Sequence, residues 1–239
     1  MMNWSVIRIV VVFVFAGALY GFAKKNHNKR EISNIKVYFD DAQALFIDEE
    51  TIENLLKENM ADSLSFSKYM LDLNGLEQML NENKMIASAD IYSDIQGELG
   101  VRVLQREPIA RFYDGSYQYL DKNGDVMPLS KLYSARVPLV SGFSEEEITI
   151  IYPLLRTFYK DEFLKKHIIA LRKKAGKSQI ELSVRNQDYT IDFGTTEHIE
   201  LKISNYKAFY LKAERDKKLK DYKTINLQFG NQVVCTLKQ

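Results

Sequence analysis

The sequence of 239 residues has little cysteine, histidine, proline or glycine. Its one cysteine, Cys235, excludes a disulfide within the chain and, with no His or Asp motif beside it, is expected to be an ordinary strand residue. The three histidines, His27, His167 and His198, lie too far apart to form a recognisable metal-binding motif. With only 4 prolines and 11 glycines, the chain is neither collagen-like nor of disordered composition. The 33 Lys and Arg residues nearly balance the 32 Asp and Glu residues, which argues against nucleic acid as a partner.

Short motifs that could carry chemistry each lack a required part. Gly176-Lys177-Ser178 ends like a phosphate-binding loop, but Leu171 stands where that loop needs its first glycine. Residues 121–125 lack the spacing and the distal glutamate of a calcium loop, so they predict a hairpin turn. The acidic run 145–147 is typical of a helix N-terminus. We therefore expect no catalytic residues, no metal and no cofactor.

The longest apolar run is at the N-terminus. Trp4 to Ala23 holds a single charge, Arg8, and as a helix would be about 30 Å long, the thickness of a bilayer core. Trp4 and Tyr20 stand near its two ends, where aromatic rings favour the membrane interface. Residues 16–18 resemble a signal-peptide cleavage site, which is the alternative. Because apolar residues continue past that site, we expect residues 1–23 to form a short N-terminal stub and an uncleaved transmembrane helix.

The charges around this span do not give a clear orientation. Lys24, Lys25, Lys29 and Arg30 all follow it, within a polar segment, 24–31, that we interpret as a juxtamembrane linker. The positive-inside rule alone would place the rest of the chain in the cytoplasm. That rule is a bias, however, and long domains can translocate regardless of it.

Residues 32–106 predict a compact unit with the order β-α-α-β-β. Apolar residues alternate in its strands and recur with helical spacing in its helices. Asp48, followed by two glutamates, is a favourable N-cap for the first helix. The expected elements are a strand at 32–39, helices from Asp48 and over 74–81, and strands at 86–92 and 99–103.

Residues 107–239 predict a β-rich domain with one or two covering helices, so the chain as a whole is expected to be α+β. Ser144 and Glu147 form a capping box that opens one helix, and Pro153 should kink or split that helix. A second long helix is expected over about 196–212. The domain closes with a strand at 223–229, a turn and a strand at 233–237.

The order of several motifs resembles one protein family. Residues 106–112, 119–124, 128–130 and 133–142, with the terminal run 225–235, are similar to the FtsQ/DivIB cell-division family, and to FtsQ of Bacteroidetes-type bacteria in particular. The resemblance covers the anchor, a POTRA-like unit and a β-domain. It implies a short cytoplasmic N-terminus, one span of the inner membrane and a periplasmic remainder at the division septum, and we prefer this orientation to the one from the charge rule.

The resemblance also implies a function. Family members are non-enzymatic divisome scaffolds that bind bitopic FtsB-like and FtsL-like proteins and help recruit or regulate septal peptidoglycan synthesis. Two other classes stay open: a membrane-anchored cell-envelope enzyme, which would need converging titratable groups, and a POTRA-type transport or chaperone module, which would need more POTRA repeats or barrel strands.

A partner site is expected on the strand at 223–229. An edge strand can take up a partner strand through its free backbone groups. Phe229 matches an aromatic position at the family's partner-binding edge, and Ile225 and Leu227 share its alternation. The alternative is that all three face the core. Asn226 and Gln228 stand where the family often has charged residues, which argues against a charge-paired contact but not against strand addition.

Overall fold

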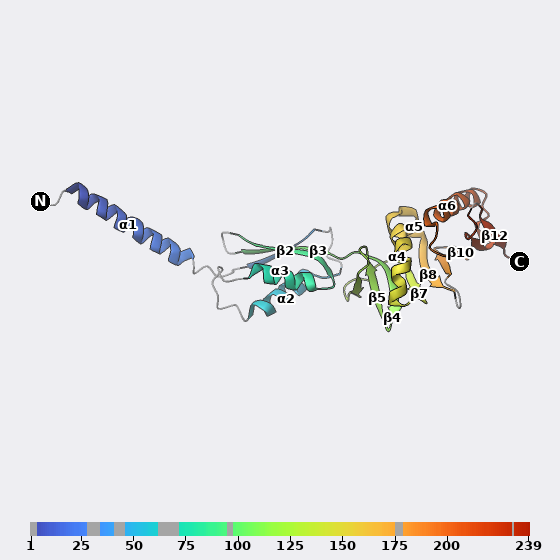
Figure 1. Cartoon of the computed structure of the whole chain (residues 1–239), viewed down its shortest axis with the longest axis horizontal. Helices are drawn as coiled ribbons and strands as arrows, with labels where there is room; N and C mark the ends of the chain where they lie inside the picture. The colour runs from blue at the N-terminus through green and yellow to red at the C-terminus, as the bar shows by residue number, and fades with distance from the viewer. Residues whose placement is uncertain are drawn as a thin grey trace. The chain divides into compact units, whose positions relative to one another are not determined.

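The computed structural model describes residues 4–27, 34–40, 46–61, 72–94, 98–174, 179–230 and 232–239 (Figure 1). The chain divides into two compact units, Met1–Gln105 and Arg106–Gln239, each with its own sheet and core.

The first element, α1 (Trp4–His27), is a helix of 24 residues with exposed apolar side chains, including Phe13 (75% exposed) and Tyr20 (70%). Within the described residues, no helix has both the length and the hydropathy needed to cross a membrane. The transmembrane helix thus stays a prediction. Trp4 begins α1, but its side chain lies outside the described set.

The helix α1 continues through residues 24–27, so the first half of the predicted linker is helical. Alanine and lysine are good helix formers, so the Ala23-Lys24-Lys25 run extends the helix instead of ending it. Residues 28–31, the rest of the predicted linker, lie outside the described residues.

The first compact unit has the predicted β-α-α-β-β order and a three-stranded sheet, β1-β3-β2. Strand β1 pairs parallel to β3, and β2 pairs antiparallel to β3, so β3 is central and its Leu99, Val101 and Val103 are fully buried. The elements are β1 (Asn34–Phe39), α2 (Glu49–Ala61), α3 (Leu73–Glu82), β2 (Ile86–Ser93) and β3 (Glu98–Gln105).

Local caps explain where the two helices of this unit begin. The Asp48 carboxylate accepts a hydrogen bond from the Thr51 backbone N–H at 3.0 Å, directly before α2. The Asp72 carboxylate likewise accepts from Gly75 N–H at 2.9 Å, directly before α3. Both helices then bury one apolar face against the sheet, including Ile52, Leu56, Leu76 and Leu80.

The second unit is a nine-stranded mixed sheet with the strand order β12-β11-β10-β9-β8-β7-β4-β5-β6. Its neighbouring strands pair antiparallel except for β4 with β7, β7 with β8, and β10 with β11, which are parallel. The strands are β4 (Pro108–Asp114), β5 (Ser116–Asp121), β6 (Val126–Pro128), β7 (Leu139–Ser141), β8 (Ile168–Lys173), β9 (Ile180–Val184), β10 (Thr190–Gly194), β11 (Tyr222–Asn226) and β12 (Val234–Leu237).

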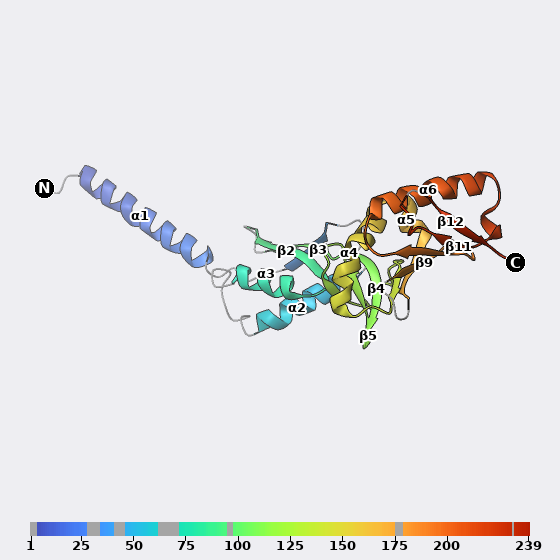
Figure 2. The ribbon, with the colours of Figure 1, turned by 45° about the vertical axis from the view of Figure 1, so that its right-hand side comes forward.

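Helices α4 (Glu145–Lys160), α5 (Glu162–His167) and α6 (Ile199–Arg215), with the short 3-10 helix η2 (Leu219–Asp221), contribute to the core of this sheet. Figure 2 shows α6 running beside the β11 and β12 end, where Phe209 packs edge-on against Tyr222 with ring centroids 5.1 Å apart. The predicted α+β class with a β-rich second domain is therefore confirmed.

Helix α4 begins where the sequence predicts. Ser144 accepts from Glu147 N–H at 3.4 Å, and the Glu147 carboxylate accepts from Ser144 N–H at 3.1 Å, which completes the capping box. Pro153 does not split the helix, because α4 continues to Lys160. Buried residues on both sides of Pro153, among them Ile151 and Leu154, hold the helix against the sheet and offset the missing backbone hydrogen bond.

Candidate partner-binding site

The strand predicted to be the exposed edge, residues 223–229, is not an edge. The strand formed there, β11, pairs with β10 on one side and with β12 on the other. Ile225 is 0% exposed and Leu227 is 3% exposed, so both belong to the core, as the alternative interpretation had it. Phe229 lies beyond the strand and is 48% exposed. The terminal strand, which the sequence also predicts, pairs along β11 and takes the edge position in its place.

Strand β12 is therefore one outer edge of the nine-stranded sheet. Lys238 N–H donates to Asp221 C=O at 2.8 Å, so the Lys238 N–H points toward β11. Backbone groups alternate in direction along a strand. The N–H and C=O groups of Leu237 and Cys235 therefore point away from β11. Among the described residues, no strand pairs with β12 on that outer side. The edge therefore offers a short row of backbone donors and acceptors.

The opposite edge, β6, is poorly suited to strand addition. It has only three residues, Val126–Pro128, and Pro128 has no N–H to donate. Short edge strands and prolines are two common ways in which proteins block strand pairing at an edge. Strand β12 is also short, with four residues, but it contains no proline, so every residue of this edge keeps its backbone N–H.

Exposed apolar side chains accompany the β12 edge. Leu237 is 60% exposed, Phe229 48% and Val234 41%. Cys235 is partly buried against the core, and burial raises the pKa of its thiol, which keeps the thiol protonated at neutral pH. The surface near the edge thus offers apolar contacts and no reactive thiolate.

The neighbouring polar residues form an uncharged network. Asn226 accepts from Gln228 N–H at 2.9 Å through its side-chain oxygen, and Gln228 accepts from Gln179 at 3.2 Å. The Gln228 side chain also lies over Gly194, where a Cβ would be only 2.7 Å from Gln228 Cγ, so that glycine allows the close approach. Both amides that replace the family's common charges are thus engaged within the fold.

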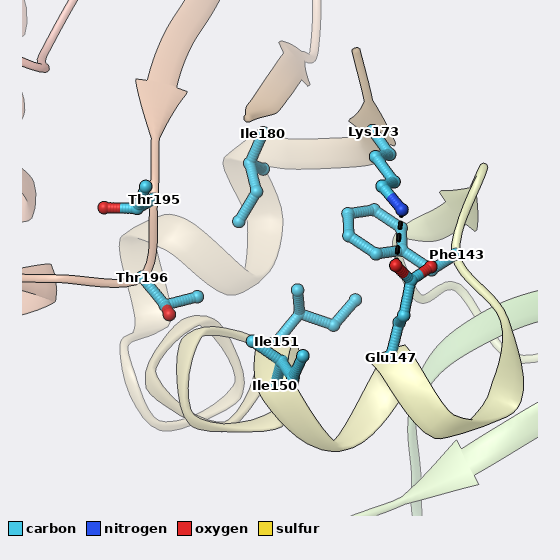
Figure 3. Close-up of a pocket in the computed structure, with 8 residues that line it drawn as sticks. All are labelled: Phe143, Glu147, Ile150, Ile151, Lys173, Ile180, Thr195 and Thr196. Carbon is cyan, nitrogen blue, oxygen red and sulfur yellow. Dashed lines mark hydrogen bonds and ion pairs between the residues drawn. The ribbon is translucent and has the colours of Figure 1, made fainter. Parts of the chain in front are cut away.

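A cavity of about 210 Å³ lies beside the N-terminal half of α4 (Figure 3). Its lining is mostly apolar, with two hydroxyls from the segment after β10, and comprises Phe143, Glu147, Ile150, Ile151, Lys173, Ile180, Thr195 and Thr196. Lys173 donates to the Glu147 carboxylate, and this hydrogen bond is the main cause of the lowered pKa of Glu147. The Glu147 and Lys173 charges therefore balance each other in the lining of the cavity.

The turn at residues 121–125 is structural. The Asp121 carboxylate is 1% exposed and accepts from Asn123 N–H and Asp125 N–H at 2.8 and 2.9 Å. Arg106 neutralises it at 3.1 Å and also contacts Asp125 at 2.8 Å. The predicted turn between two strands is confirmed. Throughout the part of the chain that the structure describes, no group of three or more His, Cys, Asp or Glu side chains is placed to hold a metal ion.

The geometry defines a class of protein: a β-α-α-β-β unit joined in sequence to a large mixed sheet with one open, apolar-flanked edge. Residues 33–104 match a POTRA-like domain. Residues 107–236, more than half of the chain, match the family described as FtsQ/DivIB, C-terminal related. The chain belongs to this family of cell-division proteins.

One curated relative supports the assignment. The chain is 29% identical over 79 residues to the cell division protein FtsQ of Geotalea daltonii (strain DSM 22248 / JCM 15807 / FRC-32). That match covers 33% of this chain and 29% of the relative, so it spans less than a third of the relative's length.

Sequence reasoning placed the open edge of the sheet one strand too far inside, on β11 instead of β12. The signal that could have corrected it was present, because the turn at 230–231 followed by a strand at 233–237 predicts a hairpin that covers 223–229 on one side. The parallel pairing of β10 with β11 covers the other side and has no local signal in the sequence.

Proposed function

We propose that this protein is a non-enzymatic scaffold of the bacterial division machinery that binds a partner by strand addition at β12. The partners are FtsB-like and FtsL-like bitopic division proteins, and the complex helps recruit or regulate septal peptidoglycan synthesis. The family supports the cell-division role. The open β12 edge is the observation that carries the binding mode.

Strand addition suits this edge for two reasons. The outward backbone groups of Cys235 and Leu237 can each form hydrogen bonds with an extended partner segment, and such bonds give affinity without requiring a particular partner sequence. Specificity then comes from side chains that alternate along the partner and meet the exposed Phe229, Val234 and Leu237. Aromatic side chains such as Phe229 are enriched among residues that dominate interface energies.

The proposal includes attachment to the inner membrane through residues 1–23, with the N-terminus cytoplasmic and residues 32–239 periplasmic. The exposed apolar side chains of α1 support attachment to a membrane, because exposing many apolar side chains on one helix is unfavourable in water. The orientation follows what is usual for the family. It places β12 on the same side of the membrane as the extracytoplasmic segments of bitopic partners.

The binding mode can be tested with two substitutions at one position. Leu237→Pro removes an outward N–H, while the Leu237→Ala variant keeps the N–H and removes the exposed side chain. Each variant of the 239-residue chain would be co-expressed with a tagged FtsB-like protein of the same organism, and the amount that co-purifies would be measured.

We expect Leu237→Pro to reduce co-purification at least tenfold and Leu237→Ala to reduce it only a few-fold. Circular dichroism of each variant would confirm that the sheet is intact. Equal retention of the partner by both variants and the parent chain would exclude strand addition at β12. Failure of the parent chain to retain any FtsB-like or FtsL-like protein would contradict the scaffold role itself.

A further inference from the structure

A second cavity, of about 280 Å³, opens where α5 ends and β8 begins, next to the turn between β9 and β10. It is distinct from the β12 edge and from the cavity in Figure 3, since it shares no residue with either. Its lining combines aromatic rings, two cations and two amides, and comprises Phe163, Lys166, His167, Arg185, Asn186, Gln187 and Tyr210. Cavities for whole small-molecule ligands are roughly 300 to 1,000 Å³, so this one suits one or two side chains.

Three of these rings contact one another. Phe163 stacks on His167 with centroids 4.7 Å apart and an interplanar angle of 21°. Tyr210 meets His167 edge-on at 4.9 Å and lies 5.1 Å from Phe163. Together, the rings form an aromatic wall in the cavity lining. Such a wall favours another flat ring, which can stack or pack edge-on against it.

The aromatic wall is backed by a buried polar chain. His167 Nε2 lies 2.6 Å from the Tyr206 hydroxyl, which lies 2.9 Å from the Tyr189 hydroxyl. Burial lowers the pKa of His167 to about 4, so its imidazole is neutral at neutral pH. The positive charge of the cavity therefore comes from Lys166 and Arg185 and not from the histidine.

Arg185 is held in position by the backbone around it. Its Nε donates to Lys166 C=O at 2.9 Å, and its own N–H donates to His167 C=O at 2.8 Å. Within the described residues, its two terminal nitrogens have no carboxylate within salt-bridge distance. A guanidinium fixed through Nε with free terminal N–H groups is well prepared to bind a carboxylate.

The acidic groups near the cavity either interact with other side chains or form only weak, exposed ion pairs. Asp161 pairs with Lys207, and Asp188 pairs with Lys238 at 3.2 Å. Glu214 accepts the Tyr210 hydroxyl at 3.3 Å. Glu162 contacts Lys166 at 3.3 Å, but both side chains are more than three quarters exposed, and such pairs contribute little. The mouth of the cavity therefore keeps a positive character that an incoming carboxylate can complement.

We propose that this cavity binds an acidic peptide segment of a partner protein, in which an Asp or Glu stands next to an aromatic residue. The aromatic ring packs against Phe163 and Tyr210, while the carboxylate bonds to Arg185 and faces Lys166. The site goes beyond the proposed scaffold function, because it needs neither β12 nor an FtsB-like partner. It would give the chain a second contact point for an acidic segment.

The three histidines provide a direct readout. The full chain, purified in a mild detergent with isotope-labelled histidine, would be titrated with acetyl-Asp-Phe-amide at pH 7 while the imidazole signals are followed by NMR. His27 and His198 lie outside the cavity lining and serve as internal references. Acetyl-Asn-Phe-amide is the matched probe without the negative charge.

We expect a saturable shift of the His167 signals with the Asp peptide, a dissociation constant at least tenfold higher with the Asn peptide, and no shift at His27 or His198. Arg185→Gln should weaken binding of the Asp peptide at least tenfold. Arg156→Gln, which removes an exposed positive charge on α4 and outside the cavity lining, should leave it unchanged. Equal binding of both peptides, or of the parent and Arg185→Gln chains, would overturn the proposal, as would the absence of any shift at His167.

Discussion

Ile225 of β11 lies directly opposite Cys235 of β12 in an antiparallel ladder, with Ile225 fully buried. This pairing moves the open edge of the large sheet from β11 to the last strand of the chain. The residues expected to contact a partner are thereby divided between the core and the surface. Ile225 and Leu227 stabilise the fold, while Phe229 stays available for contact.

Substitutions at Ile225 and Phe229 should therefore separate stability from binding. Ile225→Ala should lower the free energy of unfolding by about 2 to 4 kcal/mol, because it leaves a cavity in the core. Phe229→Lys should change it by only about 0.5 kcal/mol, since the side chain is half exposed and outside the strand. Urea denaturation followed by circular dichroism measures both.

Phe229→Lys should also weaken partner binding. Phe229→Lys should reduce retention of an FtsB-like protein at least fivefold while remaining folded. A Phe229→Lys chain that binds as well as the parent would remove Phe229 from the proposed interface and leave only the backbone edge.

Arg106 should stabilise the fold by pairing with the buried carboxylate of Asp121. Asp121 is 1% exposed, and Arg106 lies 3.1 Å from it. Arg106→Ala should lower the free energy of unfolding by about 2 kcal/mol, because it leaves that carboxylate without its cation, although two backbone N–H groups still bond to it. The matched control is Asp125→Asn, whose side chain is 61% exposed, and it should cost less than about 1 kcal/mol. Equal effects of the two substitutions would contradict this account.

The buried histidine should make the fold less stable in mild acid. Well above pH 6.5 the His167 imidazole is neutral in both the folded and the unfolded chain. As the pH falls from 6.5 to about 4, the unfolded chain binds a proton that the folded chain does not, so the free energy of unfolding decreases. At 1.36 kcal/mol per pKa unit, the decrease from this group is at most about 3 kcal/mol. Urea unfolding at several pH values measures it.

Two variants isolate the contribution of His167 from those of the carboxylates. His167→Gln should flatten the pH dependence between pH 6.5 and 4, even if the variant is less stable at every pH. His198→Gln replaces an exposed histidine and is the matched His→Gln control. An unaltered slope in the His167→Gln chain would show that this imidazole is not kept neutral by burial.

Local sequence signals predicted much of the secondary structure, and the reasons are identifiable. Ser144 and Glu147 specify the start of α4 because a capping box satisfies backbone groups within four residues. The hairpin of β4 and β5 follows from Asp114-Gly115, since Gly115 adopts a φ of +68° that glycine tolerates best. In both cases, the determining contacts lie within a few residues of one another.

The arrangement of the strands could not be predicted in the same way. The parallel pairing of β4 with β7 joins segments separated by two strands and a loop, and that of β10 with β11 joins segments separated by α6 and η2. The register of both pairings depends on packing in the shared core. The cavity around His167 has the same origin, because it combines α5, the β9–β10 turn and α6. The short helix α5 was missed because its six residues carry too little periodicity to be recognised.

Amide hydrogen exchange at the end of the chain tests the central claim most directly. The exchange rates of the Cys235 and Leu237 N–H groups would be measured in the full-length protein with and without a saturating FtsB-like partner. Strand addition at β12 predicts that both outward amides slow at least tenfold in the complex, because each gains a hydrogen bond in the new ladder. Unchanged exchange at both positions in a fully formed complex would contradict the account and place the partner elsewhere on the molecule.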